Sequence, residues 1–101
     1  MEKFIYYEIT GFLPSSFVSM KLGIVTRYAS KEKAIKELEK VLKEWKESDS
    51  FSAYGELFYE NIYDDKLING YRHQFVFKQK RTGMLNETMY KVVKHQISYN
   101  D

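Results

Sequence analysis

Two histidines, His73 and His95, are the side chains best suited to proton transfer or metal binding in this chain, which contains no cysteine. If the last two strands turn near Met84, the two imidazoles come opposite each other, which is the arrangement of a metal-binding pair. A zinc site needs further ligands, and the sequence supplies none at a recognisable spacing. We therefore expect two ordinary histidines of a sheet, with no bound metal and no cofactor.

Catalysis requires a nucleophile, an acid or a base in a defined arrangement, and the motifs that build such arrangements are missing from the sequence. The phosphate loops GxGxxG and GxxxxGK[ST] are absent, as is the zinc-protease motif HExxH. The lack of cysteine also excludes a thiol nucleophile, a disulfide framework and cysteine-bound zinc or iron-sulfur clusters. We predict that the protein is not an enzyme and has no catalytic residues.

The strongest functional signal is a set of basic residues interleaved with aromatic ones near the C-terminal end. Residues 71–101 carry six basic and two acidic side chains, a net charge of +4, whereas residues 51–70 carry a net charge of −3. Lys and Arg attract the phosphate backbone of nucleic acids, and exposed Tyr or Phe rings stack on bases. The same residues also suit a plain solvated hairpin with internal salt bridges. We predict a DNA-binding hairpin that uses Arg72, Lys78, Lys80, Arg81, Lys91 and Lys94.

The types and positions of these cations indicate how binding would work. Lys outnumbers Arg thirteen to three in the whole chain, and Arg is the usual bidentate reader of guanine. Binding should therefore depend more on backbone charge than on base identity. In an extended strand Lys78 and Lys80 lie on one face, and Lys94 shares the face of Tyr90 and Val92, so the predicted patch is split between faces.

A second candidate surface lies in the loop 11–17, GFLPSSF, which is unusually apolar for a connection. Phe12, Leu13 and Phe17 either tuck under the core or form an apolar anchor for a protein partner or a second copy of the chain. Small, cysteine-free chains rich in Tyr and Lys are typical of accessory proteins of phages and plasmids, including inhibitors of host defence. The alternative function is therefore an accessory or inhibitor protein directed at a host protein.

The element that must position these residues is the segment 30–46, SKEKAIKELEKVLKEWK, which has the clearest helical pattern in the chain. Its apolar residues recur at steps of three and four and so form one stripe, whose central members are Leu38, Leu42 and Trp45. Ser30 is a plausible N-cap, and Glu32 complements the positive end of the helix dipole. The stripe predicts one amphipathic helix packed on a sheet, with Ile35, Leu38, Leu42 and Trp45 buried against Ile5, Leu22 and Phe75.

Strands are predicted at 3–10, 18–28, 71–79 and 87–99 from alternating side chains rich in Tyr, Phe, Val and Ile. The segment 51–63 fits a strand slightly better than a helix, and 64–70 ends in the turn signal Asn69-Gly70. The predicted fold is a single α+β domain over residues 1–101, an antiparallel sheet with the element order ββαβββ. If 51–60 were helical, two helices followed by a basic hairpin would resemble a winged helix-turn-helix.

The chain carries no sign of export or membrane insertion. Its first residues, MEKFIYYEIT, lack the features of a signal peptide, and no apolar stretch of 18 residues is present. We expect a cytoplasmic protein that does not contact membranes.

Overall fold

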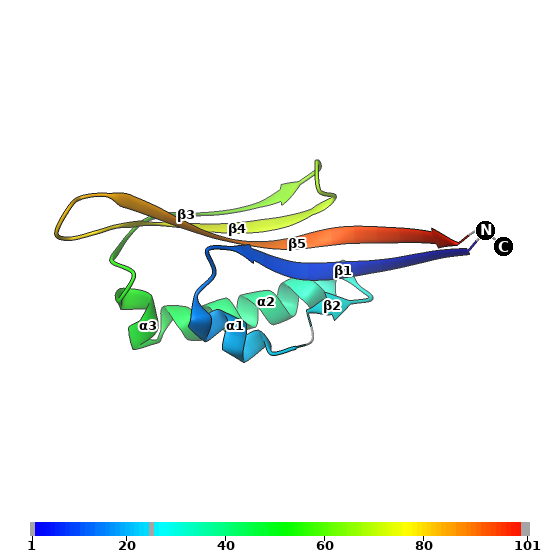
Figure 1. The fold of residues 1–101 in the computed structure, drawn as a ribbon, viewed down its shortest axis with the longest axis horizontal. Coiled ribbons are helices and arrows are strands. Elements are labelled where there is room, and N and C mark those ends of the chain that lie inside the picture. The colour runs from blue at the N-terminus through cyan, green and yellow to red at the C-terminus, as the bar shows by residue number, and fades with distance from the viewer. Residues whose placement is uncertain (1, 25, 100–101) are drawn as a thin grey trace.

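One antiparallel sheet with helices on a single face makes up the fold. The computed structural model describes residues 2–24 and 26–99. Its elements are β1 (Glu2–Phe12), α1 (Ser16–Leu22), β2 (Arg27–Tyr28), α2 (Lys31–Lys46), α3 (Asp49–Ser52), β3 (Glu56–Asp65), β4 (Gly70–Lys78) and β5 (Leu85–Tyr99). The strands lie in the order β2-β1-β5-β4-β3, and the helices lie together below the sheet (Figure 1). The predicted α+β class, with an antiparallel sheet and a long helix packed on it, is confirmed.

Helix α2 begins and ends where its sequence predicts. The Ser30 hydroxyl accepts a hydrogen bond from the Lys33 backbone N–H at 3.1 Å, which satisfies one free donor of the first turn. The apolar stripe faces the sheet and buries Ala34, Leu38, Val41, Leu42 and Trp45, whereas Ile35 is only partly buried. None of the helices in the described part of the chain has the length and apolar character needed to cross a membrane.

Aromatic rings around Trp45 form the centre of the core. The indole ring meets Phe51, Phe75 and Tyr54 edge to face at centroid distances of 4.8, 5.2 and 5.5 Å. Such edge-to-face pairs add to the stabilisation that burial provides. The predicted contact of α2 with Phe75 is confirmed, but Ile5 is exposed because β1 and β5 extend beyond the other strands at that end of the sheet (Figure 1).

The prediction of one strand over 18–28 is wrong, because α1 occupies its first part and only β2 is extended. The Ser15 hydroxyl caps α1 by accepting a hydrogen bond from the Phe17 N–H at 3.2 Å, and Gly23 ends the helix with a φ of 71°. Val18 and Leu22 point inward together. Their separation of four residues is an even number of strand steps and also about one helical turn, so the pattern fitted both structures.

The strand interpretation of 51–63 is correct from Glu56 onward, while α3 precedes it. At Gly55 the φ angle is 120°, and a Cβ there would lie 2.8 Å from the Lys78 carbonyl oxygen. This glycine therefore lets the chain leave α3 and pass close beside β4. Because residues 56–60 belong to the sheet, the winged helix-turn-helix alternative is wrong.

Candidate nucleic-acid interface

The β4–β5 connection is a closed, well-bonded turn at one end of the sheet (Figure 1). We call residues 79–84 the hairpin tip. The Gln79 N–H donates to the Met84 carbonyl at 2.9 Å, and the Gly83 N–H donates to the Gln79 carbonyl at 2.8 Å. Gly83 has a φ of 72°, a conformation that glycine adopts without steric cost. The tip therefore holds its two cations, Lys80 and Arg81, on an ordered turn.

Three exposed cations gather at this turn, and we call Lys78, Lys80 and Arg81 the tip cations. The Lys78 side chain extends from the end of β4 toward Gly83 in the turn. Its Cε lies 3.9 Å from the position that a Cβ on Gly83 would take. None of the three forms an ion pair with another described residue. A hollow of about 380 Å³, lined by Ser52, Ala53, Gly55, Gln79, Lys80 and Arg81, opens beside them.

The other three predicted cations lie elsewhere. Arg72 is half-buried and engaged, because its Nε donates to the Asp65 carboxylate and its Nη1 lies 3.1 Å from the Met89 sulfur. This hydrogen bond from Arg72 is the largest cause that holds the pKa of Asp65 below its ordinary value. Lys91 lies opposite Arg72 on the sheet face that the helices leave uncovered. Lys94 lies on the other face, with Tyr90 and Val92, as its position in the sequence predicted.

Residues Phe12, Leu13 and Phe17 do not form one surface. Phe12 and Leu13 are 54% and 63% exposed, whereas Phe17 packs against the core beneath Lys21, whose Nζ lies 5.8 Å from the ring centroid. Leu13 has a φ of 48°, which is uncommon for a bulky side chain. The Thr88 hydroxyl donates to its carbonyl at 3.3 Å and helps to hold this conformation.

His73 and His95 lie on opposite faces of the sheet, so the metal-binding pair does not exist. His73 pairs with Tyr90 on the face under α2, while His95 stacks on Tyr6 at 4.9 Å on the uncovered face. Among the described residues, no cluster of His, Asp or Glu is arranged to hold a metal ion. His95 Nε2 lies 3.5 Å from Glu8 Oε1.

A polar network around the buried His73 connects α2 to the sheet, and the sequence did not predict it. The imidazole is 2% exposed; Nδ1 lies 2.7 Å from Glu39 Oε1, and Nε2 contacts Glu60 Oε2. A neutral imidazole carries one N–H, so only the imidazolium donates to both carboxylates. Strand alternation placed His73 on the side of three aromatic residues, which is the one signal in the sequence that it would be buried.

Two further donors complete this network. Lys46 Nζ donates to Glu60 Oε1 at 2.8 Å, and the Tyr71 hydroxyl donates to Glu39. Burial by itself raises the pKa of Glu60, but the hydrogen bonds from Lys46 and His73 outweigh it and leave that pKa lowered. Burial and the bond to Glu39 raise the pKa of Tyr71. Because these groups bond to one another across three elements, the network attaches α2 to β3 and β4.

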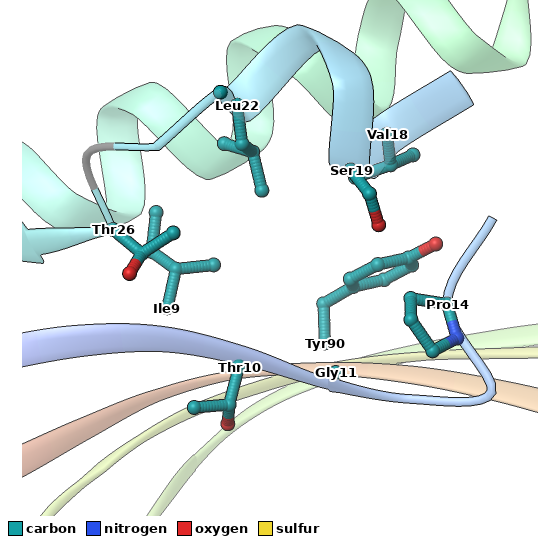
Figure 2. A pocket seen from close by; sticks show the side chains of 10 residues that line it. Ile9, Thr10, Gly11, Pro14, Val18, Ser19, Leu22, Thr26 and Tyr90 are labelled. Atoms are coloured by element: carbon teal, nitrogen blue, oxygen red, sulfur yellow. The ribbon is translucent and has the colours of Figure 1, made fainter. Parts of the chain in front are cut away.

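A small apolar cavity of about 140 Å³ lies between α1 and the sheet (Figure 2). Ile9 and Tyr90 project from the sheet toward it, and Leu22 projects from α1. The Tyr90 hydroxyl accepts a hydrogen bond from the Ser15 N–H at 2.8 Å, and burial raises its pKa to about 12. The cavity is smaller than the pockets of about 300 Å³ or more that usually hold small molecules.

The fold and these surfaces define a small α+β protein with a one-sided helical layer and a basic hairpin tip. No protein-family model matches the chain, and neither a curated protein nor a solved structure matches it.

Proposed function

We propose that the protein is a non-enzymatic nucleic-acid-binding protein that contacts phosphates through its hairpin tip. The observation that carries this proposal is the group of tip cations, which are exposed and have no ion pair with the residues that the structure describes. Cations that are already paired lose much of their attraction for phosphate, and that applies to Arg72 but not to Lys78, Lys80 or Arg81.

The geometry of the tip suits a polyanion. Its cations stand on a turn whose backbone is hydrogen-bonded, so little backbone freedom remains to be lost on binding. The hollow between the tip and α3 is bordered by Lys80 and Arg81 and is wide enough to receive a phosphate group together with its sugar. Exposed Met84, the last residue of the tip, and the adjacent Leu85 add apolar contact area.

A salt series tests this function with a charge-matched control. Fluorescence anisotropy with labelled DNA would compare the wild type, the double variant Lys80→Ala/Arg81→Ala, and the control Lys33→Ala/Lys36→Ala on the exposed side of α2. Each neutralised phosphate contributes a slope of about −0.9 in log affinity against log salt on duplex DNA. The tip variant should flatten the slope by about one to two units, while the control leaves it unchanged.

Binding that is absent at low salt would overturn the proposal, and so would binding that both double variants reduce equally. The second outcome would mean that net charge alone, rather than the tip, attracts the DNA.

We propose protein binding as the second candidate function, in which the chain acts as an accessory or inhibitor protein. Its supporting observation is the exposure of Phe12 and Leu13, with Leu13 held at a positive φ beside a hollow of about 360 Å³. Exposed apolar side chains at strained positions are typical of contact sites. Phe12→Ser/Leu13→Ser should abolish a complex or a homodimer and keep the fold, whereas Phe17→Ser should destabilise the monomer.

A further inference from the structure

The face of the sheet opposite the helices, here called the open face, carries no second layer (Figure 1). Even so, Val76 and Met89 on this face are only 5% and 8% exposed, because neighbouring side chains cover them. The open face is therefore a continuous, closely packed surface rather than a set of separate side chains in water.

Strand registers show which residues stand side by side on the open face. One row across the sheet runs Tyr63, Arg72, Lys91 and Thr10, and the next runs Asn61, Gln74, Met89 and Phe12. Tyr59 follows in the third row, opposite Val76. Within a few strand spacings the open face thus presents three aromatic rings, two side-chain amides and Lys91, which has no ion pair with another described residue.

The rings are available to a ligand. Phe12, Tyr59 and Tyr63 are 54%, 46% and 38% exposed, although aromatic side chains favour burial. Rings on a flat protein surface stack on unpaired bases, and this contact is worth about 1–3 kcal/mol per base by alanine substitution.

Charge on the open face argues against a purely electrostatic contact. Glu8 pairs with Arg27 at 3.2 Å, and Asp65 pairs with Arg72. Glu56 and Glu87 oppose Lys78 and Val76 in the register, so acidic and basic groups nearly balance. Affinity on this face must then come from stacking, which requires bases that are not already paired within a duplex.

The width of the open face also favours bases that are not paired within a duplex. The four long strands are spaced about 4.8 Å apart, so the open face is roughly 14 Å wide between the axes of its outer strands. The major groove of DNA is about 12 Å wide and admits only two strands. A face of this width cannot enter a groove, but a single strand can lie along it.

We infer that the open face binds single-stranded nucleic acid, whose bases stack on Phe12, Tyr59 and Tyr63 while Lys91 and the tip cations hold its phosphates. This inference rests on the proposed function and names its ligand. The tip and the face are continuous, because Lys78 points to the open face at the end of β4. Leu85 and Lys91 are six residues apart on β5, about 20 Å, which corresponds to a few nucleotides.

The test compares a labelled 12-nucleotide oligothymidine with a 12-base-pair duplex, using the full chain and anisotropy. The wild type should bind the single strand more tightly. Phe12→Ala/Tyr63→Ala should weaken that binding by at least about fivefold per ring, leaving the salt slope unchanged because no cation is removed. The control Met20→Ala/Leu67→Ala removes exposed apolar groups away from the open face and should leave the affinity unchanged.

The outcomes separate this inference from the proposed function. Equal or tighter duplex binding, insensitive to the ring variant but reduced by Lys80→Ala/Arg81→Ala, overturns the open-face inference and keeps the hairpin function. Binding of neither oligonucleotide at low salt overturns both and leaves the protein-partner function. Trp45 fluorescence confirms that each variant is folded.

Discussion

Leu38 gives the most direct test of how α2 is held on the sheet. The side chain is fully buried in the core, and Leu38→Ala removes three carbon atoms. At about 0.8 kcal/mol for each buried carbon, the transfer contribution alone is about 2.4 kcal/mol. The surrounding core relaxes only partly into such a gap, so a cavity contribution should raise the loss to about 3–4 kcal/mol. That is a large fraction of the 5–15 kcal/mol that stabilises a typical domain.

Trp45 is the single tryptophan, and it is fully buried, so its fluorescence reports the core directly in a urea titration. Leu67→Ala is the matched control, because it makes the same chemical change at a side chain that is 95% exposed and should alter stability by less than about 0.5 kcal/mol. With an m value of about 1–2 kcal/mol/M, Leu38→Ala should lower the urea midpoint by about 2 M. Equal midpoints for the two variants would refute the burial of the α2 stripe.

Two further predictions concern the sheet. Because the pKa of Glu60 is lowered in the fold, its ionised form stabilises the protein above its ordinary value of 4.5, and this contribution disappears as the pH falls through the folded value. The stability difference between wild type and Glu60→Gln should thus be larger at pH 7 than at pH 3 in urea titrations; a constant difference would contradict the network. A Cβ on Gly70 would lie 1.8 Å from the Val92 carbonyl oxygen, so Gly70→Ala should cost about 3 kcal/mol or more in thermal unfolding. Gly11→Ala, whose Cβ would meet the Pro14 side chain at 3.0 Å, should cost clearly less.

At Gly70 the local sequence pattern correctly indicates a turn but does not reveal why the position requires glycine. The dipeptide Asn69-Gly70 predicted a turn. In the fold Asn69 takes the positive φ, 51°, and Gly70 is needed because β4 passes too close to Val92 for any side chain. A contact with a residue twenty-two positions away leaves no trace in the local sequence.

The difference between local sequence patterns and contacts between distant residues also explains which parts of the fold could be predicted. Segments 30–46, 71–79 and 87–99 follow one period for ten residues or so, and the structure forms them within one or two residues of the predicted ends. The strand prediction for 18–28 failed because the buried Val18 and the partly buried Leu22 lie four residues apart and so fit either period, while the side chain of Ser15 caps a helix. Short elements carry too few repeats to separate the two periods.

Some features of the candidate sites also follow from the local sequence, whereas others depend on contacts between distant residues. Turn residues and charge placed Lys80 and Arg81 at the tip, since both properties are local. Arg72 pairs with Asp65, and His73 pairs with Glu39 and Glu60. These pairs depend on elements that the fold brings together. Charge counts alone therefore overestimated the cations available to a ligand.

The aromatic residues of the open face support the proposed function because the core does not require them. Phe75, Phe77 and Tyr90 pack under the helices, where their burial stabilises the core. Phe12 and Tyr63 lie on the other side of the sheet, where polar side chains would keep the strands paired and cover the surface with water. Because Phe12 and Tyr63 remain 54% and 38% exposed, they stabilise the isolated chain less than the fully buried core rings do, and their uncovered surface is available to the proposed ligand. Substitutions there should therefore change binding and lower the unfolding midpoint much less than Leu38→Ala does.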